Sequence, residues 1–244
     1  MLNTLENRGM DVLHEHCLTN THYDAVGIKR EFGVYSGIRS KLVELRRKIY
    51  PSQRLRTFHK TKRVKIITIV REPISRNLSL CFQHFTDFVR DDVTNRCFDD
   101  QKSSVEMFSH YLENKIDQKA GIYWFDREFL PTTGVDIYDF PFDREKGCTA
   151  LQSGKYDILV LQLEKLNASM SSIQEFLGLT EPVELVQKNI GRKKWYHLLY
   201  QEFKSAYAPP QSLVDEIYTS RFMKHFYSDA DISRFRRKWE KTHA

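Results

Sequence analysis

The fold is decided by the stretch Lys65-Ile-Ile-Thr-Ile-Val-Arg-Glu-Pro-Ile-Ser-Arg-Asn-Leu-Ser79. Four apolar β-branched side chains precede Arg71, a run that predicts a strand buried on both faces of a sheet. A Glu-Pro turn follows, and Pro73 is well tolerated in the first turn of a helix. The stretch therefore predicts a strand that stops at Arg71 and continues, through a turn, into a helix.

This strand–turn–helix is a candidate anion site. In an open α/β sheet, ligands bind beyond the carboxyl ends of the strands, where free helix N–H groups and a guanidinium attract anions. Arg71 at the strand tip and Ser79 about two helical turns further on can reach one phosphate. Ser75 and Arg76 lie at the same helix start. The alternative is an ordinary strand–turn–helix whose Arg caps a sheet edge, and the pattern alone does not decide between them.

The composition is that of a globular protein, with 41% hydrophobic and 29% charged residues. A chain of 244 residues fits one large domain or two small ones. The net charge of +6 is mild and spread along the chain, which is compatible with an anionic ligand and argues against nucleic-acid binding.

Neither a metal site nor a membrane span is expected. The four cysteines form no CxxC pair, so we expect buried thiols rather than a zinc site or a disulfide framework. No stretch approaches the roughly 20 apolar residues that cross a bilayer. The N-terminus lacks a signal-peptide pattern. These features predict a soluble, cytoplasmic protein with no transmembrane segment.

Hydrophobic periodicity predicts strands that alternate with helices. Further strands are expected at 10–18 and 156–163, and an extended segment at 134–142. The expected helices and helical turns span 1–8, 36–50, 104–116, 124–130, 166–177, 195–206, 212–225 and 229–239. We therefore expect a single domain over residues 1–244 with a parallel α/β sheet, and a helical C-terminal subregion over about 186–244.

His14-Glu15-His16 is a candidate for acid–base chemistry. Alternation along a strand directs His14 and His16 to the same side. A neutral imidazole near pH 7 can accept a proton from an attacking hydroxyl. Zinc would also fit the spacing, but no third ligand stands nearby in the sequence. The alternative is that the two histidines are polar residues solvated at a strand end.

Two further groups could contact a substrate. Tyr123-Trp-Phe-Asp-Arg-Glu128 is aromatic and acidic, which suits a sugar, with Trp124 against a pyranose face and Asp126 and Glu128 accepting hydroxyl hydrogen bonds. More often, such residues pack between helices. Arg192, Lys193 and Lys194 form a basic cluster that could close over an anion, or could be a solvated helix start.

The stretch around Arg71 closely resembles the 3′-phosphate-binding motif of sulfotransferases, with an Arg, a Pro two residues on and a Ser eight residues after the Arg. Those enzymes use 3′-phosphoadenosine 5′-phosphosulfate (PAPS). The resemblance implies that Arg71 and Ser79 hold the 3′-phosphate. Uronyl 2-O-sulfotransferases carry a similar His-x-His on the preceding strand, which implies that His16, or His14, is the general base.

The C-terminal third resembles the end of bacterial proteins described as putative capsular polysaccharide synthesis proteins, a sulfotransferase-like family. The matching residues are Asn189 to Tyr196, Tyr200, Pro209-Pro210, Ile217-Tyr218, His225 to Ser228 and Trp239. With the strand at 156–163, the resemblance covers about residues 4 to 240. It implies a P-loop-NTPase-like fold, in which a three-layer parallel sheet is flanked by helices.

The loop that holds the 5′-phosphosulfate in this family, a Gly-x-x-x-x-Gly-Thr/Ser turn after the first strand, has no counterpart here. The earliest glycine is Gly9. We therefore expect the first strand and the phosphosulfate loop to be absent from the chain as written.

The resemblance implies a metal-independent sulfotransferase that moves a sulfuryl group from PAPS to a carbohydrate hydroxyl of a capsule or other surface glycan. One alternative is a non-catalytic binding or scaffold protein that kept the fold and lost the loop. A nucleotide phosphotransferase is disfavoured because no Walker lysine is visible.

Overall fold

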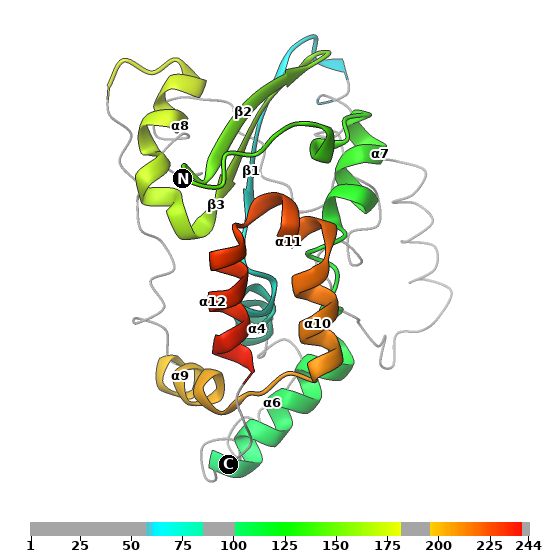
Figure 1. Cartoon of the computed structure of the whole chain (residues 1–244), viewed down its shortest axis with the longest axis vertical. Coiled ribbons are helices and arrows are strands. Elements are labelled where there is room, and N and C mark those ends of the chain that lie inside the picture. The colour runs from blue at the N-terminus through cyan, green and yellow to red at the C-terminus, as the bar shows by residue number, and fades with distance from the viewer. Residues whose placement is uncertain (1–57, 59, 85–100, 182–195, 241–244) are drawn as a thin grey trace. The chain divides into compact units, whose positions relative to one another are not determined.

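The computed structural model describes residues 58, 60–84, 101–181 and 196–240. These residues form two compact units (Figure 1). The sheet unit comprises residues 58, 60–70 and 123–181. The helical unit comprises residues 71–84, 101–122 and 196–240. The strand expected at 10–18 and the helices expected at 1–8 and 36–50 lie outside the described residues.

The sheet unit contains a mixed three-stranded sheet in the order β1-β3-β2. Strand β1 (Val64–Val70) pairs in parallel with β3 (Tyr156–Gln162), so both strands predicted here are confirmed. Strand β2 (Cys148–Ser153) was not predicted, and it pairs antiparallel with β3 through a two-residue turn that begins with Gly154 at φ 56°. Such turns require left-handed backbone, which glycine adopts without strain. The expected parallel arrangement therefore holds for one pair only.

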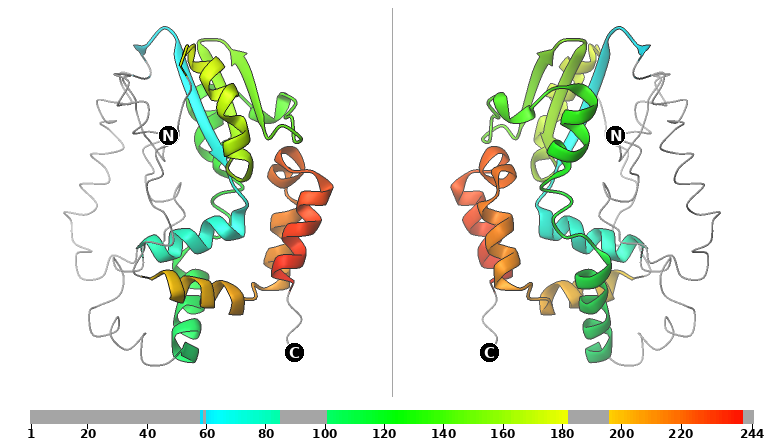
Figure 2. Two further views of the ribbon diagram at one scale, coloured as in Figure 1. Left: turned by 90° about the vertical axis from the view of Figure 1, so that its left-hand side faces the viewer. Right: turned by 90° about the vertical axis from the view of Figure 1, so that its right-hand side faces the viewer.

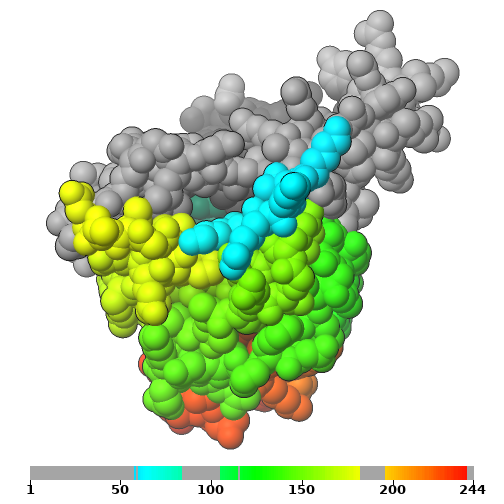
Figure 3. All heavy atoms as spheres, turned by 90° about the horizontal axis from the view of Figure 1, so that it is seen from above, coloured from blue at the N-terminus to red at the C-terminus, as the bar shows by residue number. Residues whose placement is uncertain are grey.

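Burial differs sharply between the two parallel strands. Strand β3 is buried almost throughout, as a strand with a neighbour on each side should be. In β1 only Val70 is buried, and Ile69 is 39% exposed. The sequence predicted that β1 is covered on both faces, whereas all of its side chains except that of Val70 are half-buried or exposed. In the space-filling view of Figure 3, β1 lies at the margin of the sheet unit.

Helical segments flank the sheet. Helix α8 (Met170–Leu177) follows the 3₁₀ segment η4 (Leu163–Ser169) and covers one face, packing Ile173 against Leu159 and Leu161. Segments η2 (Phe125–Phe129) and α7 (Leu130–Thr133) lie on the other side of the sheet in the opposed views of Figure 2. A 3₁₀ turn, η3 (Ile137–Asp139), interrupts the expected extended segment. The unit is therefore α/β, and a P-loop-like three-layer arrangement stays a prediction.

The helical unit contains, among the described residues, helices α4 (Pro73–His84), α6 (Gln101–Lys115), α9 (His197–Ala206), α10 (Gln211–Thr219), α11 (Arg221–Phe226) and α12 (Asp229–Trp239). The bounds of α12 match the prediction, and Ser228 caps it by accepting the N–H of Asp231. The single helix expected at 212–225 is instead two helices, because Ser220 is extended and its side chain caps α11. The expectation of one domain over the whole chain stays a prediction.

Aromatic packing builds the core of the helical unit. Phe82 of α4 stacks on Phe108 of α6 with ring centroids 4.3 Å apart. It also contacts Phe203 at 5.6 Å and the edge of Tyr200 at 5.1 Å, both on α9. The adjacent Cys81 is a free, buried thiol, as the composition predicted. This core holds α4, and so the residues at its start, in one position.

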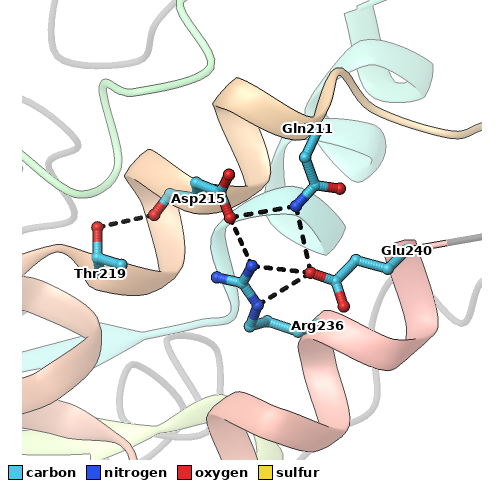
Figure 4. Close-up of polar contacts among 5 residues, drawn as sticks. All are labelled: Gln211, Asp215, Thr219, Arg236 and Glu240. Atoms are coloured by element: carbon cyan, nitrogen blue, oxygen red, sulfur yellow. Dashed lines mark hydrogen bonds and ion pairs between the residues drawn. The ribbon is translucent and has the colours of Figure 1, made fainter.

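A polar network joins α10 to the end of α12 (Figure 4). Arg236 donates to the carboxylates of Asp215 and Glu240, and the Gln211 amide donates to the same two groups. Hydrogen bonds from Arg236 and then from Gln211 hold the pKa of Asp215 below its ordinary value of 3.8. The ionised Asp215 carboxylate therefore stabilises the folded state at pH values above its ordinary pKa of 3.8. This stabilisation is lost as the pH falls through the lower pKa that the group has in the folded state.

We expect Asp215→Asn to lower the melting temperature slightly at pH 7, by no more than about 3 °C because the Asp215 side chain is 52% exposed. The difference from wild type should shrink between about pH 5 and pH 3. Differential scanning calorimetry across this range measures both effects, and Asp126→Asn, at an exposed carboxylate with no ion pair among the described residues, is the control. A difference that is independent of pH would contradict the role of the ionised carboxylate.

Candidate anion site at the start of helix α4

Arg71 and Ser79 are in direct contact. Helix α4 carries Ser79 two turns from its start, and Nη2 of Arg71 donates to the Oγ of Ser79 over 3.0 Å. Both side chains are half-buried. Among the described residues, no carboxylate pairs with the Arg71 guanidinium. The two residues that the sequence predicted to act together therefore lie together.

The start of α4 is not a free anion site, contrary to the sequence-based expectation. Glu72, 1% exposed, accepts the N–H of Ile74 at Oε1 and the N–H of Ser75 at Oε2, each over 2.8 Å. The Tyr218 hydroxyl of α10 also donates to Oε1, over 2.7 Å. A carboxylate is favourable at a helix N-terminus, because it neutralises the helix dipole and satisfies free N–H groups. The N–H groups of Ile74 and Ser75 are therefore already engaged by Glu72 and are not free to bind an anion.

Arg76 adds a second cation beside Arg71. Its Nη1 donates to Oδ1 of the buried Asn77 over 3.0 Å, and its aliphatic stem lies against Gly121, where an added Cβ would be 3.3 Å from Cδ. Burial, and then the positive charge of Arg71, lower the pKa of Arg76 to about 10, against the opposing effect of Asp117. The Arg76 guanidinium is therefore still protonated at pH 7, and its positive charge adds to that of Arg71 beside helix α4.

Ser75 is engaged by a residue from the far end of the chain. Nζ of Lys238, in the last turn of α12, donates to the Oγ of Ser75 over 2.8 Å. The same ammonium lies over the ring of Trp239, 4.2 Å from its centroid. Lys238 was not predicted from the sequence as a site residue. Nothing local distinguishes it from the neighbouring basic residues of α12, and only the fold brings it to Ser75.

The aromatic–acidic segment belongs to the sheet unit. Trp124 contacts Phe125 at 5.2 Å and Phe129 at 5.9 Å between ring centroids, so its indole is part of a packed cluster. Glu128 is buried at 2% exposure, whereas Asp126 is exposed. The packing favours the structural interpretation of Trp124, and a substrate role for these residues stays a prediction.

The other predicted site residues lie outside the described part of the chain. They are His14, His16, Arg192, Lys193 and Lys194. Their proposed roles therefore rest on the sequence.

Comparison with known proteins identifies the family. No helix in the described residues combines the length and the hydrophobicity needed to cross a membrane. Searches of curated proteins and of solved structures found no significant match. Residues 97–228, more than half of the chain, match the NKWYS family, described as "Putative capsular polysaccharide synthesis protein". The chain belongs to the NKWYS family.

Proposed function

We propose that this chain is a sulfotransferase that moves a sulfuryl group from PAPS to a carbohydrate hydroxyl during capsular polysaccharide synthesis. Family membership supports the pathway. The observation that carries the finer proposal is the hydrogen bond from Arg71 to Ser79, at a guanidinium with no carboxylate partner among the described residues. A guanidinium and a serine hydroxyl are suited to two oxygens of one phosphate.

In this proposal the 3′-phosphate of the nucleotide binds along α4. Arg71 and Ser79 contact its oxygens, and Ser75 and Arg76 contribute from the same helix. Because Glu72 occupies the helix N-terminus, the phosphate is held by side chains rather than by free backbone N–H groups. This arrangement favours a ligand whose charge is concentrated in a phosphate monoester.

Sulfuryl transfer requires a base and a leaving group. The acceptor oxygen attacks sulfur, the bond from sulfur to the 5′-phosphate oxygen breaks, and adenosine 3′,5′-bisphosphate leaves. His16, or His14, takes the hydroxyl proton. Trp124, Asp126 and Glu128 would contact the sugar. Arg192, Lys193 and Lys194 would offset the charge of the nucleotide.

Calorimetric titration of the full chain with adenosine 3′,5′-bisphosphate and with adenosine 5′-monophosphate tests the nucleotide site. We expect the bisphosphate to bind and the monophosphate to bind at least tenfold more weakly, since it lacks the group that Arg71 would hold. Equal affinities, or no binding of the bisphosphate, would overturn the proposal. Transfer of labelled sulfate from PAPS to capsular oligosaccharides then tests catalysis, and binding without transfer would favour the non-catalytic alternative.

A further inference from the structure

Two cation–serine pairs lie side by side on α4. Ser75 and Ser79 are four residues apart in one helix, so they occupy the same face on consecutive turns, with Cβ atoms about 5–6 Å apart. Ser75 accepts a hydrogen bond from Lys238, and Ser79 accepts one from Arg71. The two cations come from opposite ends of the described chain and converge on one helix face.

Among the described residues, no acceptor takes the hydroxyl hydrogen of Ser75 or of Ser79. A hydroxyl has one hydrogen to donate and two lone pairs to accept with. The Oγ atoms of Ser75 and Ser79 each accept from a cation, and neither donates to any residue in the described ranges. Each O–H group is polarised by the cation that it faces. The face thus offers two O–H donors beside two positive charges, a set that matches an anion with several oxygens.

Both cations and carboxylates lie near this face in the described part of the chain. Arg71, Arg76 and Lys238 are cations, Glu72 accepts the N–H of Ser75, and the charge of Asp117 acts on Arg76. Both oxygens of Glu72 already accept hydrogen bonds from Ile74, Ser75 and Tyr218. The Glu72 carboxylate is thus committed to the helix start.

The ammonium of Lys238 is held in position before any ligand binds. It lies over the Trp239 ring, and Trp239 is 1% exposed, so this ring is fixed in the core of the helical unit. The α12 helix is anchored at its start by the Ser228 cap and near its end by Arg236. A cation that is already ordered loses little conformational entropy when an anion binds.

We propose that Lys238 is an anion-binding residue of the α4 site, and that Lys238 with Ser75 and Arg71 with Ser79 grip the same phosphate monoester. The identification of that phosphate as the 3′-phosphate of a nucleotide rests on the proposed function. The C-terminal helix therefore contributes directly to ligand binding, in addition to closing the core.

The test compares Lys238→Ala with Arg237→Ala in the full chain. Arg237 is the neighbouring residue of α12 and is exposed, so its replacement removes the same charge without touching Ser75. The probes are adenosine 3′,5′-bisphosphate, adenosine 5′-monophosphate and inorganic phosphate, titrated by calorimetry. We expect Lys238→Ala to weaken binding of the bisphosphate and of phosphate about tenfold or more, and Arg237→Ala to change them less than threefold. Ser75→Ala, which leaves α12 intact, should weaken the same two ligands.

The outcomes separate this inference from the proposed function. If the bisphosphate binds and Lys238→Ala behaves like Arg237→Ala, the role of Lys238 is wrong and the proposed function stands. If the bisphosphate binds no better than the monophosphate, while phosphate binding still depends on Lys238, the proposed function is wrong and the anion site stands. If none of the three probes binds the wild-type chain, both are wrong. Thermal melting of each variant shows whether a loss of affinity reflects unfolding.

Discussion

Replacing Glu72 with alanine is expected to lower the free energy of unfolding by about 3 to 5 kcal/mol. The Glu72 carboxylate is buried at 1% exposure and accepts hydrogen bonds from two backbone N–H groups of α4 and from the Tyr218 hydroxyl. Its removal leaves three buried or half-buried donors without an acceptor and takes the negative charge away from the start of the helix. A loss of this kind exceeds that of most single substitutions.

Two further variants provide reference values for the loss of stability expected from Glu72→Ala. Tyr218→Phe removes one donor and leaves the bonds to the helix start intact, so we expect a loss of about 1 kcal/mol. Glu106→Ala replaces an exposed glutamate of α6 in the same unit and should be nearly neutral. Urea unfolding followed by circular dichroism measures all three. A Glu72→Ala variant as stable as Glu106→Ala would show that the carboxylate does not hold the start of α4.

Replacing Arg71 with alanine is expected to weaken the binding of adenosine 3′,5′-bisphosphate by at least 100-fold. The guanidinium would supply two charge-assisted hydrogen bonds to one phosphate, and Ser79 cannot replace that charge. Arg71 is half-buried, and its one hydrogen bond to a described residue is to Ser79, so the fold should tolerate the change. Calorimetric titration measures the affinity, and thermal melting verifies that the variant is folded.

Arg71→Lys separates charge from geometry in this prediction. A lysine keeps the positive charge but lacks the planar fork, so we expect it to recover only part of the affinity. Arg237→Ala, which removes an exposed charge of the same sign, should bind the bisphosphate almost as wild type does. An Arg71→Ala variant with undiminished affinity would place the ligand elsewhere. A loss as large in Arg237→Ala would indicate a diffuse charge effect.

Local patterns predicted most of the elements that the structure describes. The β-branched run before Arg71 and the apolar stretch at 156–163 are strands, and Ser228 starts the last helix as its capping chemistry indicates. The prediction of strands from local patterns failed where strand pairing or solvent exposure depended on residues far away in the sequence. The alternation of apolar and polar residues along β2 is too weak to predict a strand by itself. The Gly154-Lys155 turn before β3 was nevertheless a usable signal for a hairpin. The partial exposure of β1 was also not evident from its run of apolar β-branched residues.

The sequence by itself determined the strand–turn–helix and the spacing that brings Arg71 to Ser79, because both depend on contacts within eight residues of the chain. The family follows from the sequence as well. Only the tertiary structure decided that Glu72 fills the start of α4, with Tyr218 as its partner, and that Lys238 reaches Ser75. Those contacts join residues 146 and 163 positions apart, and such pairs are selected by how the helices pack rather than by the periodicity of either segment.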